Sequence, residues 1–244
     1  MTESNKPTSK HQIDLPEKWQ RPFFAMWTGQ AFSLAGSRVV QFALVWWLTV
    51  KTDSAVVLTT MTIVALVPEI VLSPFAGALI DRWNRRWVMI VADSAIALGA
   101  IALGYLFWAD QIEVWHIYAL VFVRGLAGAF HWPAMQASTS LMVPDKHLTR
   151  VAGLNQSLNG VLSILGPVLG ALVVESFLMY QVMAIDVVTA LIGILPLLFV
   201  FIPQPKPSES DQEKTSILSD MIAGYRYFIG WRGMVAIIIA AMII

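Results

Sequence analysis

Cysteine is missing from all 244 residues of the sequence, which excludes disulfide bonds, thiolate metal sites and a thiol nucleophile. Charge is also scarce, since charged residues make up 13% of the chain, whereas a soluble protein of this size carries about 25%. The basic and acidic residues number 16 each, so no net charge attracts the chain to nucleic acid. Hydrophobic residues account for 57%. This composition favours lipid surroundings.

Motifs of the common enzyme classes are absent as well. The sequence has no Gly-x-x-x-x-Gly-Lys-Ser/Thr phosphate loop, which argues against ATP-driven pumping. It has no Gly-x-Ser-x-Gly nucleophile turn and no closely spaced set of histidines and carboxylates. We therefore predict that the chain is not an enzyme and uses neither a cofactor nor a metal.

Long apolar runs recur along the chain at regular intervals. A hydrocarbon core of about 30 Å takes roughly 20 helical residues to cross. The sequence predicts six such helices, at 23–49, 55–80, 87–108, 115–141, 151–174 and 179–202. The predicted fold is all-α and integral to the membrane. Its parts are a tail (1–22), a six-helix bundle (23–202), a linker with an amphipathic helix (203–230) and an incomplete seventh membrane helix (231–244).

The distribution of Lys and Arg predicts the orientation of these helices. Thirteen of them fall in the tail and the even-numbered connections, against Lys51 alone on the other side. Positive residues are retained on the cytoplasmic side. We expect the amino terminus, the linker and the turn Asp81-Arg82-Trp83-Asn84-Arg85-Arg86 to be cytoplasmic.

Five ionisable side chains fall inside the predicted spans: Arg38, Glu69, Asp93, Arg124 and Asp186. Each costs at least about 2.5 to 3.5 kcal/mol at the centre of an isolated helix, so each should face protein or water. Their depths permit Arg38 to pair with Glu69 and Arg124 with Asp186, without establishing either contact. The alternative is that they are static ties between helices. His131 also lies in a span, and we interpret it as a packing or pocket residue, with a proton-handling role as the alternative.

Three motifs resemble signatures of the major facilitator superfamily of transporters. Residues 77–86 resemble its Gly-x-x-x-Asp-Arg-x-Gly-Arg-Arg turn, with Asn84 in a glycine position where a left-handed turn is tolerated. Residues 124–128 resemble its Arg-x-x-x-Gly motif. Residues 166–171 resemble its antiporter signature, although Leu162 replaces an earlier glycine. Further stretches, at 27–31, 129–134 and 153–158, resemble the macrolide-efflux branch of the drug:proton antiporters.

The resemblance implies the first half of a twelve-helix exporter in the plasma membrane of a bacterium. Such a transporter has two six-helix bundles, binds a drug-sized amphiphile such as a macrolide between them, and expels it as protons enter. We therefore expect the partners to be a small amphiphilic substrate, protons, the lipid bilayer and a second six-helix bundle, with no nucleic acid. We expect the sequence to hold the first bundle and the start of the seventh helix, either as an incomplete transporter or as a chain that needs a partner bundle.

Roles for individual residues follow from the resemblance and from side-chain chemistry. A conformational latch is expected from Gly77, Asp81, Arg82, Arg85 and Arg86. Proton coupling is expected from Glu69, Arg124, Arg38, Asp186 and Asp93, and the antiporter motif comprises Gly166, Pro167 and Gly170. Aromatic, methionine and amide side chains suit a promiscuous amphiphile site, and the expected substrate-binding residues are Trp27, Gln30, Phe32, Met135 and Gln136.

Two other functions stay open at this point. The first is an importer of a small solute, which differs from an exporter in the direction of transport along the proton gradient. The second is a half-length membrane subunit without transport activity of its own.

Overall fold

A computed structural model describes residues 19–204, and within them it contains six helices and no strand. The helices are α1 (Gln20–Thr52), α2 (Ala55–Arg82), α3 (Arg85–Trp108), α4 (Val114–Met142), α5 (Asp145–Ser176) and α6 (Met179–Phe199). All six contain segments long and apolar enough to cross a membrane, which confirms the predicted fold class. The predicted tail up to residue 18, the linker beyond residue 204 and the seventh helix lie outside the described residues.

Helices α1, α5 and α6 differ from their predicted bounds by three residues or more. Helix α1 begins at Gln20 and ends at Thr52, so residues 20–22 are helix and not part of the predicted tail. Helix α5 begins at Asp145, six residues before the predicted start, because Pro144 occupies the N-cap and Asp145 lies in the first turn. A carboxylate there is stabilised by the helix dipole, so the polar residues before 151 form helix that extends beyond the apolar segment. Helix α6 ends at Phe199, and Val200 is already extended.

The arginine-rich turn connects α2 to α3 with two residues, Trp83 and Asn84. Asn84 has φ −71° and ψ 107°, which is extended and not left-handed, and its side-chain oxygen accepts a hydrogen bond from the Arg86 amide at 3.1 Å. Tolerance of a left-handed turn is therefore not what suits Asn84 to this position. Asn84 fits this position because it caps the amino terminus of α3.

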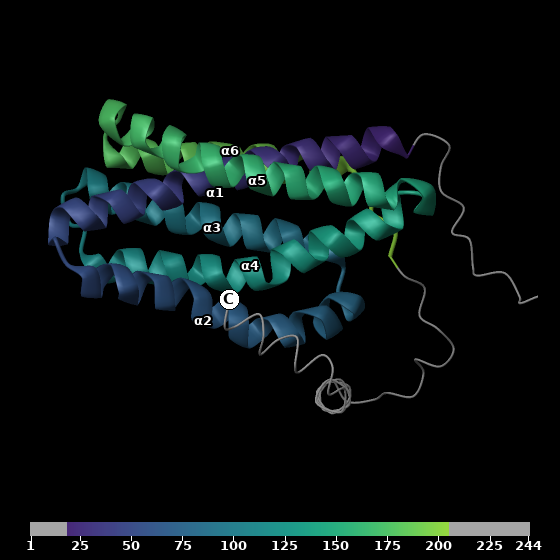
Figure 1. Cartoon of the computed structure of the whole chain (residues 1–244), viewed down its shortest axis with the longest axis horizontal. Helices are drawn as coiled ribbons and strands as arrows, with labels where there is room; N and C mark the ends of the chain where they lie inside the picture. The colour runs from purple at the N-terminus through teal and green to yellow at the C-terminus, as the bar shows by residue number, and fades with distance from the viewer. Residues whose placement is uncertain (1–18, 205–244) are drawn as a thin grey trace, which may run out of the picture.

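The six helices run roughly along the long axis of the molecule (Figure 1). α1 packs against α5 and α6, α3 packs against α4 and α6, and α2 packs mainly against α4. Buried apolar side chains form an inner cluster near the arginine turn, which includes Phe23, Met89 and Leu197. A second, outer cluster lies toward the opposite end and includes Leu44, Leu103, Ile117 and Met183. The segments between the clusters carry the buried side chains of Gln30, Ser33, Asp93, His131 and Asp186.

Glycines allow α1 to approach α6 closely. A Cβ atom placed on Gly36 would lie 1.9 Å from Thr189 Oγ1, and one on Gly29 would lie 3.0 Å from the Ile192 carbonyl oxygen. Because lipid provides no hydrophobic force between helices, such close packing is a main source of their association.

We predict that Gly36→Ala destabilises the bundle, because the Thr189 side chain must move to admit the methyl group. Overpacking of this kind costs about 1 to 3 kcal/mol. Thermal unfolding of the detergent-solubilised protein measures the effect. Gly160→Ala is the matched control, since no atom lies within 4 Å of the added methyl group there. Equal melting temperatures for the two variants would show that α1 and α6 are not in close contact.

Candidate functional site

Two layers of buried polar side chains cross the bundle between the two apolar clusters. The outer layer contains Arg124 from α4 and Asp186 from α6, which form an ion pair. Arg124 Nη1 also donates to the Ser37 carbonyl oxygen at 3.1 Å, and Ser37 Oγ donates to Asp186 Oδ1 at 3.0 Å. Of the two pairings that depth allowed, this one is present. It joins α1, α4 and α6.

The inner layer lies about two helical turns away, from Ser37 to Gln30 along α1. Gln30 Nε2 donates to Asp93 Oδ2 at 3.1 Å and lies 3.2 Å from the Gly193 carbonyl oxygen. Ser33 Oγ donates to Asp93 Oδ1 at 3.2 Å. His131 Nε2 lies 2.7 Å from Gln30 Oε1 and 3.4 Å from Asp93 Oδ1. These buried side chains connect α1, α3, α4 and α6.

Arg38 and Glu69, the other pairing that depth allowed, are not in contact. Both side chains belong to exposed residues, on α1 and α2 respectively, and no ion pair joins them within residues 19–204. Each therefore presents a charge on the outside of the bundle in the middle of a membrane segment. Direct contact with lipid is energetically unfavourable for such a charge.

Exposed polar residues in the middle of the described spans belong to α1, α2, α4 and α5, and we call this set of residues the polar face. The same helices also expose apolar side chains, such as Ile70 on α2 and Val168 on α5. Besides the two charges above, its members are Thr28 on α1, Thr62 and Ser73 on α2, Gln136 and Ser140 on α4, and Gln156, Ser157 and Ser163 on α5. In contrast, the exposed middle positions of α3 and α6 are apolar: Val91, Leu98, Ile101, Val188, Leu191 and Leu195. The surface of α3 and α6 suits lipid, and the polar face suits protein or water.

The latch residues lie where α2 meets α3. Arg85 Nη2 contacts Asp81 Oδ1 at 3.1 Å, with the arginine side chain 6% exposed and the carboxylate 74% exposed. Arg86 donates to the Leu198 carbonyl oxygen of α6. Arg82 and Gly77 are exposed, and no atom lies within 4 Å of the position that a Cβ on Gly77 would occupy. The turn thus combines one buried arginine with an accessible carboxylate.

The antiporter-motif glycines pack α5 against α1. A Cβ on Gly166 would lie 3.1 Å from Arg38 Cβ, and one on Gly170 would lie 2.7 Å from Phe42 Cδ1. Pro167 is exposed beside them. The motif therefore holds α5 next to the segment of α1 that carries an exposed charge.

The five expected substrate-binding residues divide into two groups. Gln30 and Met135 are buried, the first in the inner layer and the second in the inner apolar cluster, so neither is open to a ligand in this conformation. Phe32 and Gln136 are exposed, and Trp27 is half-buried with its Nε1 donating to Asn155 Oδ1 at 2.7 Å. Only these last three residues could contact a ligand here.

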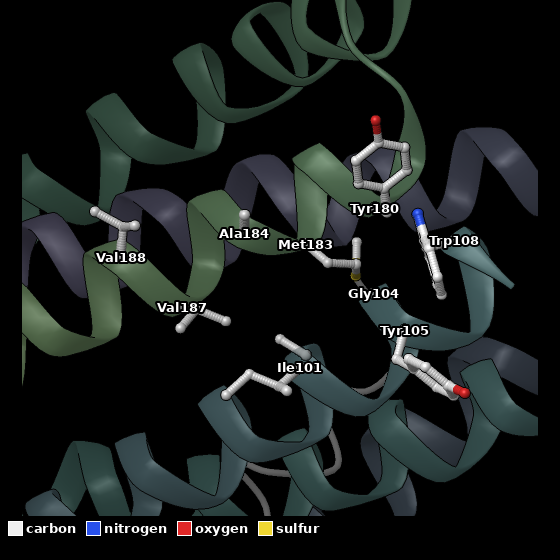
Figure 2. Close-up of a pocket in the computed structure, with 10 residues that line it drawn as sticks. Ile101, Gly104, Tyr105, Trp108, Tyr180, Met183, Ala184, Val187 and Val188 are labelled. Atoms are coloured by element: carbon white, nitrogen blue, oxygen red, sulfur yellow. The ribbon is translucent and has the colours of Figure 1, made fainter.

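Two apolar cavities lie between helices. One, of about 380 Å³, opens between the outer halves of α3 and α6, where Figure 2 shows side chains such as Ile101 and Val187 lining it. The other, of about 560 Å³, lies beside the arginine turn and is lined by Trp83, Trp87 and Phe130. None of the expected substrate-binding residues lines either cavity.

Sequence reasoning missed three polar partners of these sites. Ser33 and Ser37 are uncharged and belong to none of the motifs, yet each donates a hydrogen bond to a buried carboxylate. His131 was interpreted as a packing or pocket residue, and the structure places it in the inner layer. The spacing of residues could have pointed to two of them. Ser37 lies seven residues after Gln30, and His131 lies seven residues after Arg124, as Gly193 does after Asp186.

Comparison with known proteins agrees with this geometry. The sequence model described as "Major Facilitator Superfamily" matches residues 26–244. The chain is 37% identical to "Macrolide efflux protein A" of Streptococcus pyogenes over 186 residues, which cover 76% of this chain and 46% of that protein. It is 36% identical to the protein of the same name from Enterococcus faecalis over 151 residues, covering 62% and 46% respectively.

A more distant relative is "Tetracycline resistance protein, class H" of Pasteurella multocida, 31% identical over 104 residues, which cover 43% of this chain and 24% of that protein. The chain spans about half the length of the macrolide efflux proteins that it matches. With most of its length matched by the family and six helices suited to crossing a bilayer, this chain is a multi-pass membrane protein that belongs to the Major Facilitator Superfamily.

Proposed function

We propose that this chain is the amino-terminal bundle of a proton-coupled exporter of drug-like amphiphiles such as macrolides. The observation that carries the proposal is the polar face, with Arg38 and Glu69 exposed at mid-membrane depth. A second six-helix bundle covers this face, and the substrate binds in the water-filled space between the two. The direction of transport is supported by the relatives, two of which are named macrolide efflux proteins.

Transport in such an arrangement alternates between two orientations of one bundle against the other. Asp81 and Arg85 act as the latch of one orientation. Arg85 is buried, and its Nε and Nη1 atoms have no hydrogen-bond partner within the described residues, while the Asp81 carboxylate reaches the surface. The carboxylate can therefore leave Arg85 for a partner on the second bundle while the arginine stays in place. The same geometry and the positive-inside rule support a cytoplasmic position for this turn and for the amino terminus.

Proton coupling on the polar face is assigned to Glu69. Its carboxylate is exposed to the space between the bundles, and Pro68 directly precedes it in α2. Arg124 and Asp186 neutralise one another inside the bundle, so they support the structure and transmit its changes between α4 and α6. Phe32, Gln136 and Trp27 supply this bundle's contacts to the amphiphile.

We predict that water-soluble thiol reagents distinguish the polar face from the lipid surface. Because the chain has no cysteine, single substitutions can be read without background. Glu69→Cys, Gln136→Cys and Ser163→Cys should be labelled by a membrane-impermeant maleimide, and Leu98→Cys and Leu191→Cys should resist it. Equal labelling of both sets would refute a hydrated face.

We predict that Asp81→Asn reduces macrolide efflux to the level of cells without the protein, because the amide cannot hold the Arg85 guanidinium by charge. Efflux is measured by accumulation of a radiolabelled macrolide, and membrane insertion by the amount of protein in the membrane fraction. Asp110→Asn, in the connection between α3 and α4, is the matched control and should transport normally. Wild-type efflux by Asp81→Asn would remove the latch.

We predict that Glu69→Gln abolishes the response of efflux to pH while leaving macrolide binding within about a factor of three of wild type. The amide keeps the size of the side chain and cannot exchange a proton. Efflux into buffers from pH 6 to pH 8 provides the measurement. An unchanged pH profile would assign the transported proton to another carboxylate.

A further inference from the structure

The two buried layers are built on the same plan. α1 supplies Gln30 to the inner layer and Ser37 to the outer, and α4 supplies His131 and Arg124. In α6 the corresponding positions are Gly193 and Asp186. Each pair is seven residues apart, which is about two turns and about 10 Å along a helix. Both layers therefore set a basic side chain of α4 against a buried carboxylate.

The layers differ in whether their basic side chain is permanently charged. In the outer layer the guanidinium of Arg124 is charged at every accessible pH, so the layer is neutral with Asp186 ionised. In the inner layer the carboxylate of Asp93 is faced by two neutral donors, Gln30 and Ser33, and by the imidazole of His131. The inner layer is neutral only when its acid–imidazole pair holds one additional proton.

Hydrogen bonding fixes how the pair is oriented. Gln30 Nε2 faces two acceptors, Asp93 Oδ2 and the Gly193 carbonyl, so the amide oxygen must be the atom that faces His131. His131 Nε2 therefore carries a hydrogen and donates it to Gln30 Oε1. The neutral imidazole already uses this hydrogen, so the additional proton occupies either the second ring nitrogen or the carboxylate.

We propose that His131 and Asp93 form a buried proton-binding site that holds one proton at neutral pH. The proton comes from water, and its binding changes the net charge of the pair from −1 to 0. A single uncompensated charge in the bundle interior is strongly disfavoured, which is the physical reason for the binding. Because the inner layer connects α1, α3, α4 and α6, binding of this proton affects the contacts among these four helices.

The other charged side chains of the described spans do not supply this charge. Arg124 and Asp186 neutralise each other in the outer layer, and Arg85 pairs with Asp81 at the start of α3. Arg38 and Glu69 are exposed, on α1 and α2 respectively. Use of the buried proton during transport rests on the proposed function, whereas its binding does not.

The test uses the full chain in lipid nanodiscs at pH 7, with ¹⁵N-labelled histidine and ¹³C-labelled aspartate carboxyl groups. Nitrogen resonances give the charged fraction of His131, and carboxyl resonances give the protonated fraction of Asp93. We expect the two fractions to sum to about one. A sum near zero would overturn the proposal.

Two variants identify the groups. In Asp93→Asn the charged fraction of His131 should fall at least tenfold if the imidazole holds the proton in the wild type, and the protonated carboxyl signal should vanish if the carboxylate does. In His131→Gln the carboxyl group of Asp93 should become fully protonated. Glu69→Gln is the matched control and should change neither signal. If Asp93→Asn leaves the charged fraction of His131 unchanged and His131→Gln leaves the Asp93 carboxylate ionised, the site is excluded.

A result that excludes the buried proton-binding site can be distinguished from one that excludes the proposed function. Macrolide efflux by the same variants is measured separately, in cells that also supply the second six-helix bundle that the proposed function requires. A sum of one without any efflux would leave the buried site and remove the exporter, and efflux with a sum near zero would do the reverse.

Discussion

A charge inside a bilayer must be paired, hydrated or covered by protein, and this constraint explains the arrangement of the six helices. Arg124 and Asp186 satisfy it by pairing, and the two of them bind three helices together. Glu69 and Arg38 do not pair, so their surroundings must supply water or protein. The same constraint leaves α3 and α6 with an apolar outer surface. The same constraint thus distinguishes the apolar surface of α3 and α6 from the polar face.

The hydrogen bonds of the two buried layers are stabilised by the apolar clusters on either side of them. Side chains such as Leu44 and Ile117 close one end of the polar region, and Phe23 and Met89 close the other. Dry apolar packing on both sides keeps water from competing for the hydrogen bonds within each layer. Close approach of the helices adds to this, since Gly36 and Gly193 bring the backbones of α1 and α6 together. The buried hydrogen bonds therefore depend on the apolar packing around them.

Much of the fold could be predicted from sequence because a membrane span depends on local composition. All six spans were located, and the main errors were at ends such as Asp145, where helix continues into polar sequence. The sites were harder. The depth of Arg124 and Asp186 allowed their contact, but the same argument allowed a contact between Arg38 and Glu69 that the fold does not make. Depth gives one coordinate of a side chain, whereas contact also depends on helix rotation and on which helices are neighbours.

The unequal exposure of Asp81 and Arg85 makes their contact sensitive to the salt concentration of the surrounding solution. Counter-ions can reach the carboxylate at 74% exposure, whereas the guanidinium is shielded at 6%. Dissolved salt therefore weakens this contact, with a screening distance of about 8 Å at physiological concentration, and leaves the deeply buried ion pair of Arg124 almost untouched. A change in salt concentration on the side of the membrane that this turn faces would therefore alter the surface contact alone, and the contacts inside the bundle would stay the same.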